Sequence, residues 1–346
     1  MESWEVALLV VALVVGAASF ASLGIWLLFA SRFLGRRTFE KANPVCVQWE
    51  DLAAKGIDRT PFVHKLRGQE TIQGFLYSKG DLKGKPLIIL SPGYGDTHLQ
   101  YLFDIRMLVL NGFLVLAYDQ YGTGMSSGRS LGYLAKGRKV LDGIIDDVES
   151  RSLGQGRRLF LYGYSWGGYC VLSVLAKHPE IAKCVARAPL DNPVLAPLET
   201  GKLVLGGFLM DLCKPMAVLS SLVMHGPKAF KSAHGGLSRN DTTRVLITAS
   251  AKDRIVPLKA SPIRYLRRHP QGNVSVVVWP SRIAHNDLVS DESLEGYGAK
   301  VREWKELATS ADYPRALDGF LGSLDREKAI RVDEKAQDAI LGFLRG

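Results

Sequence analysis

The longest apolar run in the chain lies at its N-terminal end. Residues 6–30 contain no charged side chain and consist mostly of Val, Leu, Ala and Phe. As a helix rising ~1.5 Å per residue, this run is roughly 37 Å long, whereas the hydrocarbon core of a bilayer is ~30 Å thick. The pattern therefore predicts a transmembrane helix, with residues 1–35 as a membrane anchor and residues 36–346 as the folded body.

A cleaved signal peptide is the alternative for the same segment. Signal peptides carry a basic segment before an apolar run of about 7–15 residues. Here the preceding charges are acidic, Glu2 and Glu5, and the run is longer, so an uncleaved anchor is favoured. Basic side chains follow the run instead: Arg32, Arg36, Arg37 and Lys41. By the positive-inside rule this predicts a single-pass membrane protein with a cytoplasmic body.

Beyond the anchor, strand-like and helix-like segments alternate. Segments 61–66 and 71–77 flank a polar turn and predict an antiparallel hairpin. Continuous apolar runs then alternate with helical patterns, as in strands that helices cover on both faces. The expected strands are 86–90, 113–119, 158–163, 181–189, 244–250 and 274–279, and the expected helices are 97–111, 136–150, 166–178, 294–308 and 333–345. This order predicts an α/β fold with a mostly parallel central sheet and helices on both faces.

One connection, between residues 189 and 244, is far longer than a crossover of about a dozen residues requires. Its middle part, residues 198–227, is apolar and rich in Met. Long insertions in compact domains are usually functional, so we expect a helical cap insertion at about 191–240 over one edge of the sheet. An extension of the core is the alternative.

Composition narrows the classes of partner. The chain has 346 residues, a formal net charge of +10 and 47% hydrophobic residues, which is ordinary for a globular protein apart from the charge. The Lys and Arg residues form no cluster interleaved with aromatic residues, so we expect no nucleic-acid partner and attribute the charge to a membrane surface. The Cys spacing contains no C-x-x-C, so we expect free thiols, no disulfide and no metal.

The segment 161–170, LYGYSWGGYC, places Ser165 between Gly163 and Gly167, directly after an expected strand and before an expected helix. A serine on a sharp strand-to-helix turn needs small neighbours two residues away on each side. The same geometry aims the N–H of Trp166 and the positive end of the helix beside the hydroxyl. A plain glycine-rich turn is the alternative, but the strand–turn–helix context favours a nucleophile.

A serine nucleophile needs a base that a third group orients. His285 follows the last expected strand by a few residues, which places it at the carboxyl edge of the sheet, where Ser165 also lies. Asp253 follows the strand at 244–250 directly, and the order Ser, Asp, His along the chain is typical of nucleophile-elbow hydrolases. Asp191, after the strand at 181–189, is a rival acid. The other histidines lie in helices, in the hairpin or in the insertion, and His178 and His269 are expected to be structural.

A tetrahedral oxyanion needs two donors. Trp166 N–H is one, and the glycine-rich loop 91–96, SPGYGD, supplies the second in our interpretation, through the N–H of Tyr94.

Residues 45–346 resemble the α/β-hydrolase superfamily, especially its serine aminopeptidase-like and monoacylglycerol-lipase-like branch. The resemblance is carried by SPGYGD, DQYGTGMSSG (119–128), GYSWGG, KDRIVP and AHNDL. Pro92 stands where this branch often has a loop histidine, which should matter little because the donor is a backbone N–H. The resemblance implies a cofactor-independent triad of Ser165, His285 and Asp253, with Tyr94 and Trp166 as oxyanion donors and Asp119 in a structural role.

The leading functional prediction is a membrane-anchored serine hydrolase that cleaves carboxylic esters of acyl chains, such as lysophospholipids or monoacylglycerols. It rests on the apolar cap and on an anchor that would hold the site near lipid. A serine aminopeptidase is the first alternative, and would need acidic groups in the cap to bind an ammonium; the insertion offers Asp191, Glu199, Asp211 and Asp241. A non-catalytic binding protein is the second alternative, against which the retention of all the catalytic side chains argues.

Overall fold

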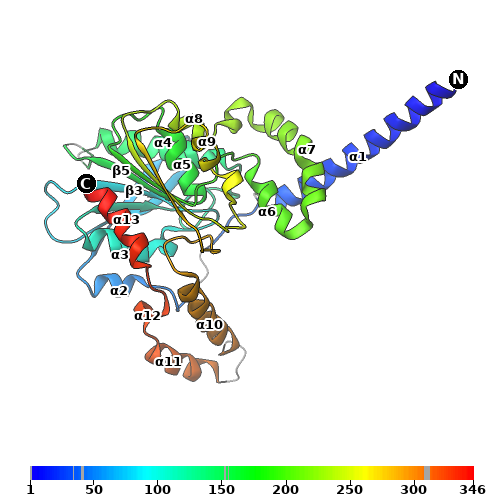
Figure 1. The fold of residues 1–346 in the computed structure, drawn as a ribbon. Coiled ribbons are helices and arrows are strands. Elements are labelled where there is room, and N and C mark those ends of the chain that lie inside the picture. Colours follow the sequence, from blue (N-terminus) through cyan, green and yellow to red (C-terminus); the bar gives the residue numbers. More distant parts are fainter. Residues whose placement is uncertain (1, 34, 40–42, 152, 155, 308–311) are drawn as a thin grey trace.

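A central sheet organises the molecule. The structure is a computed structural model that describes every residue except 1, 34, 40–42, 152, 155 and 308–311 (Figure 1). Within the described residues, the sheet has eight strands in the order β1-β2-β4-β3-β5-β6-β7-β8. Their bounds are β1 (Asp58–Lys65), β2 (Thr71–Ser78), β3 (Leu87–Ser91), β4 (Leu114–Tyr118), β5 (Leu159–Tyr164), β6 (Lys183–Arg187), β7 (Arg244–Ser250) and β8 (Val274–Trp279).

The pairing confirms the expected hairpin and the mostly parallel sheet. Strand β2 pairs antiparallel with β1 and β4, and the other neighbouring strands pair in parallel. Every residue of β3, β4 and β6 is buried, which explains their continuous apolar runs, whereas β8 at the edge of the sheet is partly exposed. Each expected strand is present, with ends that differ by a few residues.

Helices cover both faces of the sheet (Figure 1). One face carries α4 (Ala135–Ser150), α5 (Trp166–Val174), α8 (Ala233–Leu237) and α9 (Ile263–Leu266). The other carries α2 (Trp49–Ala53), α3 (Leu102–Leu110) and α13 (Glu334–Arg345). Helix α4 illustrates why a helix packs on the sheet, because its apolar side chains recur at helical spacing and form one buried face: Val140, Leu141, Ile144, Ile145 and Val148.

The C-terminal part differs from the expectation. The segment 294–308 belongs to α10 (Asp291–Leu307), with residue 308 outside the described residues. Helices α11 (Tyr313–Ser323) and α12 (Arg326–Ala329) follow and were not expected, and with α10 they project from the sheet (Figure 1). The expected helix 97–111 is also two elements, because a 3-10 turn, η1 (His98–Tyr101), precedes α3.

The apolar N-terminal run forms helix α1 (Ser3–Phe33), which points away from the sheet (Figure 1). Helices α6 (Ala196–Leu205) and α7 (Gly207–His225), which we call the cap, lie between β6 and β7 along the chain and beside α1. Both α1 and α7 are long and apolar enough to cross a membrane, with mean hydropathies of 2.6 and 1.4 over their most apolar windows. By length and composition, α1 is consistent with an anchor and with a signal sequence.

The end of α1 is fastened to the cap and to the body. In α1, Ser22 and Trp26 are buried against α7, and the Trp26 Nε1 donates a hydrogen bond of 2.8 Å to the Ser220 Oγ. Beyond the helix, the Arg37 guanidinium donates to the carbonyls of Gly124 and Gly128 in the loop after β4. The predicted basic residue Lys41 lies outside the described residues. Helix α1 is therefore packed against folded protein only over its C-terminal part.

Cys46, Cys170, Cys184 and Cys213 form no disulfide among the described residues, and all but Cys46 are buried. Burial raises the pKa of the Cys170 and Cys184 thiols above the ordinary value, so both remain protonated and unreactive at neutral pH.

Candidate active site

Ser165 lies on a strained turn between β5 and α5. Its backbone has φ 55° and ψ −112°, and it is one of two non-glycine residues with positive φ among the described residues. A Cβ at Gly163 would collide with the Gly167 carbonyl oxygen, and one at Gly167 would collide with the Ser91 carbonyl oxygen. The turn therefore requires glycine at both positions, which is why the sequence carries small residues on both sides of Ser165.

The structure brings Ser165, His285 and Asp253 together, although they lie far apart in the chain. The Ser165 Oγ is 2.8 Å from the His285 Nε2, and the His285 Nδ1 is 2.6 Å from the Asp253 Oδ2. The other carboxylate oxygen of Asp253 accepts hydrogen bonds from the backbone N–H groups of Ile255 and Val256. Asp253 is thus held in one orientation, and a hydrogen-bonded line runs from the acid through the imidazole to the hydroxyl.

The rival acid is engaged elsewhere. The carboxylate of Asp191 lies 2.7 Å from the Nδ1 of His234 and also accepts the His234 backbone N–H. It therefore fixes the start of α8 to the end of β6 and does not contact His285. Asp119, expected to be structural, accepts from the N–H of His98 and the N–H of Met125, and so organises the loop after β4.

Tyr94 lies on the loop after β3, and Trp166 directly follows Ser165 in the chain. Trp166 is the first residue of α5, where backbone N–H groups have no partner within the helix. Two hydrogen bonds stabilise the Tyr94 loop, because the Gly93 N–H donates to the Tyr101 hydroxyl, which donates in turn to the Asp96 carboxylate. Burial raises the pKa of Asp96 to about 6, against the lowering effect of the Tyr101 hydrogen bond and of nearby His285.

A small cavity opens beside Ser165. It has a volume of about 90 Å³, and its lining is mainly apolar, including Phe33, Tyr94, Leu134 and Leu190. The rings of Phe33 and Tyr94 stack with centroids 4.2 Å apart and planes 12° apart. Phe33 is the last residue of α1, so the N-terminal helix supplies part of the wall of the site. Sequence reasoning missed this residue, because it treated the apolar run only as an anchor.

A buried ion cluster supports the His285 loop. Arg187, at the end of β6, contacts Asp104 at 2.6 Å and Asp287 at 3.1 Å, and its Nη2 donates to the Asn286 Oδ1 at 2.6 Å. The three charged side chains are at most 8% exposed. Burial raises the pKa of the Asp104 carboxyl, although Arg187 acts in the opposite direction. Sequence reasoning missed this cluster, for which the only signal was a lone arginine in an apolar strand.

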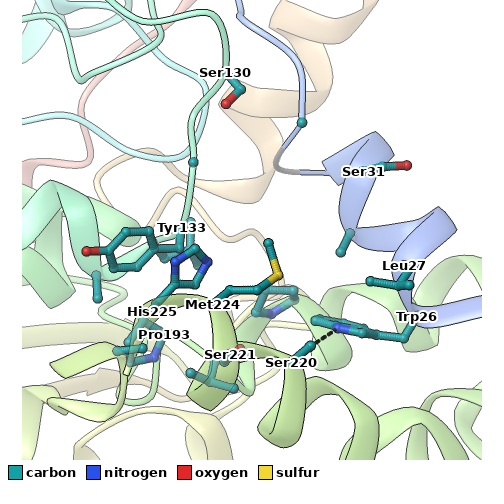
Figure 2. Close-up of a pocket in the computed structure, with 18 residues that line it drawn as sticks. Trp26, Leu27, Ser31, Ser130, Tyr133, Pro193, Ser220, Ser221, Met224 and His225 are labelled. Carbon is teal, nitrogen blue, oxygen red and sulfur yellow. Dashed lines mark hydrogen bonds between the residues drawn. The ribbon is translucent and has the colours of Figure 1, made fainter. Parts of the chain in front are cut away.

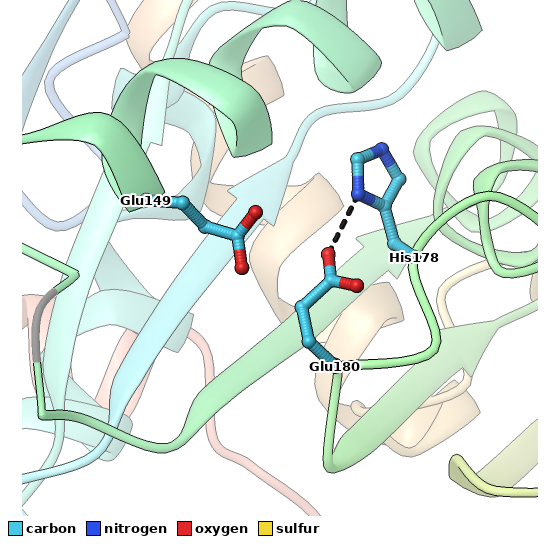
Figure 3. A group of neighbouring side chains, drawn as sticks. All are labelled: Glu149, His178 and Glu180. Atoms are coloured by element: carbon cyan, nitrogen blue, oxygen red, sulfur yellow. Dashed lines mark hydrogen bonds and ion pairs between the residues drawn. The ribbon is translucent and has the colours of Figure 1, made fainter.

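A second group of titratable side chains lies away from Ser165. Glu149, His178 and Glu180 hold potential ligand atoms within 4.8 Å of one another (Figure 3). The His178 ring contacts Glu180 through Nδ1 at 2.7 Å and Asp142 through Nε2 at 2.8 Å. Burial lowers the pKa of His178, but the two carboxylates outweigh it and raise the pKa overall. Both ring nitrogens therefore face carboxylates, which fits the expected structural role of His178 rather than a metal ligand.

The chain is similar to known hydrolases in part of its sequence and in its fold. Residues 83–233 match the family described as serine aminopeptidase, S33. The comparison with curated proteins gives no match. Among solved structures, an esterase from Pyrococcus furiosus has 17% sequence identity and a TM-score of 0.56, with 78% of this chain and 96% of that chain covered.

A second solved structure, the acylaminoacyl peptidase of Pyrococcus horikoshii, has 13% identity and a TM-score of 0.52, and the match covers 69% of this chain and 40% of that one. At these identities the likeness concerns the fold, and both the sheet order and the strained serine turn agree with it. The chain has the α/β-hydrolase fold, and it is similar to the serine aminopeptidase family over residues 83–233.

Proposed function

We propose that the protein is a membrane-anchored serine hydrolase that cleaves carboxylic esters of acyl chains, with lysophospholipids or monoacylglycerols as the substrate class. The observation that carries the proposal is the hydrogen-bonded line from Asp253 through His285 to Ser165, at 2.6 Å and 2.8 Å. It is the arrangement in which an imidazole can accept the serine proton while a carboxylate stabilises the imidazolium.

The reaction would proceed in two halves. Ser165 Oγ attacks the ester carbonyl as His285 Nε2 takes its proton, and the N–H groups of Tyr94 and Trp166 stabilise the resulting oxyanion. The tetrahedral intermediate expels the alcohol, which leaves with the proton from His285, and Ser165 is acylated. Water then gives a proton to His285 and attacks the acyl carbonyl, and collapse releases the carboxylic acid and restores the Ser165 hydroxyl.

Exposed apolar surface supports the membrane anchor. Residues 6–18 of α1 are all exposed, although most of them are apolar. The apolar surface continues onto the cap, where Phe208 is 86% and Val223 is 76% exposed. A folded protein rarely leaves so continuous an apolar surface in water, so contact with a bilayer is its expected environment. The basic residues after α1 support a cytoplasmic body.

The charges of the cap favour an ester over a peptide with a free N-terminus. Glu199 lines the cavity at Ser165, where an acid could bind an ammonium group. However, its carboxylate lies 3.0 Å from the Lys202 ammonium and 3.5 Å from that of Lys259. Asp211 also pairs with Lys202, and Asp191 pairs with His234. The acids near the site therefore already contact other side chains of the protein, which disfavours aminopeptidase activity.

A substrate panel tests the proposal. The full chain, purified in detergent, is assayed with p-nitrophenyl esters and with aminoacyl-arylamides, and Ser165→Ala serves as the inactive control. We expect turnover of the esters, much weaker turnover of the arylamides, and loss of both in the control. Preferential cleavage of the arylamides would establish the peptidase instead. Absence of any turnover by the folded protein would favour a binding protein.

A further inference from the structure

A second and larger cavity lies between the anchor helix and the cap. Its volume is about 310 Å³, roughly twice the ~150 Å³ of an engineered apolar cavity that binds benzene. Trp26, Leu27 and Ala30 of α1 form one wall, and Ser221 and Met224 of α7 form the opposite wall (Figure 2).

The lining of this cavity suits an aliphatic chain. Among the described residues that line it, none is Asp, Glu, Lys or Arg. Two of the polar side chains at its rim contact each other, since the Trp26 indole donates to Ser220, and the His225 ring stacks on Tyr133 with centroids 4.0 Å apart (Figure 2). A ligand here would contact mainly apolar groups and, among the described residues, no charged carboxylate, ammonium or guanidinium group.

The larger cavity adjoins the small one beside Ser165. Leu134 lines both, and its carbonyl accepts a hydrogen bond from the Trp166 indole at 2.7 Å, which ties the shared wall to the serine turn. In α1, Phe33 faces the small cavity while Ala30, one turn earlier, faces the larger one. The two cavities are therefore neighbours along the end of α1, and an extended chain attached to a carbonyl at Ser165 would reach the larger one past Leu134.

We propose that the cavity between α1 and the cap binds the aliphatic chain of the substrate, so that the anchor helix is part of the binding site and sets the chain length accepted. This proposal rests on the proposed function and extends it, because it assigns the acyl-chain site and makes long-chain lipid esters the preferred substrates. The helix is held rigidly enough for this role, through the stacking of Phe33 on Tyr94 and the hydrogen bonds of Arg37 and Thr38 to the loop after β4.

The position of the cavity relative to a bilayer supports the same conclusion. The buried positions of α1 begin at Ser22, so residues 3–21 remain free to enter a membrane. At ~1.5 Å per residue this free part is about 28 Å long, close to the ~30 Å thickness of a hydrocarbon core. The cavity then lies at the membrane surface. A lipid chain would have only a short distance to travel from the bilayer.

Tryptophan substitutions on both walls provide the test. Ala30→Trp fills the cavity from α1, and Ser221→Trp fills it from the cap. Their matched controls are Leu28→Trp, at a position that is 64% exposed, and Val223→Trp, at one that is 76% exposed. For each full-length protein in lipid nanodiscs, kcat/KM is measured with a two-carbon and a twelve-carbon p-nitrophenyl ester, and the rate of Ser165 labelling is measured with two-carbon and twelve-carbon alkyl fluorophosphonates.

We expect the wild type to have the higher kcat/KM with the twelve-carbon ester. The two cavity variants should lower the ratio of kcat/KM for the long ester to that for the short ester by about tenfold, since loss of even one methylene contact in an apolar pocket costs roughly that factor. The two controls should keep the wild-type ratio. An unchanged ratio in both cavity variants, an equal fall in the controls, or a wild-type preference for the short chain would overturn the proposal. If the wild type neither cleaves nor is labelled by the short reagents, the proposed function itself fails. Because the two substitutions lie on different helices, a folding defect in one variant still leaves the other to test the role of the cavity.

Discussion

Replacement of Arg187 by methionine should destabilise the protein in a way that depends on pH. The guanidinium neutralises two buried carboxylates, Asp104 and Asp287, of which the second has an oxygen with no hydrogen-bond partner among the described residues. Removal of one partner from a buried ion pair typically costs ~3–5 kcal/mol. Because the stability of a domain is about 5–15 kcal/mol, Arg187→Met is expected to remove a third or more of it at neutral pH.

The sign of the pH dependence follows from the same burial. Without Arg187, the largest effect that opposes desolvation is lost, and burial raises the pKa of the Asp104 carboxyl in the folded state further above the unfolded value of about 3.9. A raised folded-state pKa of an acid means that stability is fully present below the unfolded pKa and is lost as pH rises through the folded pKa. The deficit of Arg187→Met relative to wild type should therefore be small at pH 4–5 and reach its full size by pH 8.

The assay is urea unfolding of the full chain in detergent at pH 5 and pH 8. Arg267→Met, a change at an exposed position, is the control and should stay within about 0.5 kcal/mol of wild type. Adding Asp287→Asn to Arg187→Met should restore part of the stability at pH 8. A deficit below about 1 kcal/mol, or an equal deficit at both pH values, would refute the reasoning. Since Arg187 also holds Asn286, labelling of Ser165 should slow in the same variant.

Three further predictions address the acid, the loop and the serine turn. Asp253→Asn should lower kcat for short esters by ~10³–10⁴ with unfolding unchanged, because the imidazole loses its orienting acceptor; a loss below tenfold would contradict this. The stability of Asp96→Asn relative to wild type, measured by urea unfolding, should increase by up to ~3 kcal/mol from pH 4 to pH 8. The reason is that ionisation of the Asp96 carboxyl, with its pKa of about 6, destabilises the folded wild type. A difference in stability that stays constant with pH would contradict this. Gly163→Ala should lower the free energy of unfolding by ~1–3 kcal/mol, because the added Cβ collides with the backbone. The control Gly342→Ala, in α13 with open space around it, should raise the free energy of unfolding by about 0.5–1 kcal/mol. Equal effects of the two substitutions in thermal unfolding would argue against the strained turn.

The sequence was most informative where one local rule fixes the structure. Continuous apolar runs placed the buried strands, because a strand that helices cover on both faces has no polar face to show. The glycines around Ser165 were readable because the backbone leaves no room for a Cβ at either position. The Asp253–His285 contact was predictable in outline, because the carboxyl ends of parallel strands meet at one edge of the sheet.

Features that depend on packing between distant segments could not be predicted from the sequence. The contact of Phe33 with Tyr94 depends on the direction in which α1 leaves the body, and no local pattern encodes that direction. The partners of Arg187 come from α3 and from the loop after β8, so its position at the end of the buried strand β6 does not identify them. Helix α12 has four residues, too few for a helical period to be visible, whereas the apolar residues of α11 do recur at helical spacing, so this helix could have been predicted from the sequence.

The central claim is that Ser165 is a nucleophile activated by His285, and covalent labelling tests it most directly. The full chain is treated with a short fluorophosphonate, and the site of the adduct is located by peptide mass spectrometry. We predict a single adduct on Ser165, absent from Ser165→Ala and formed at least ~10²-fold more slowly in His285→Ala. An adduct on another residue, or a rate that the loss of His285 leaves unchanged, would contradict the account.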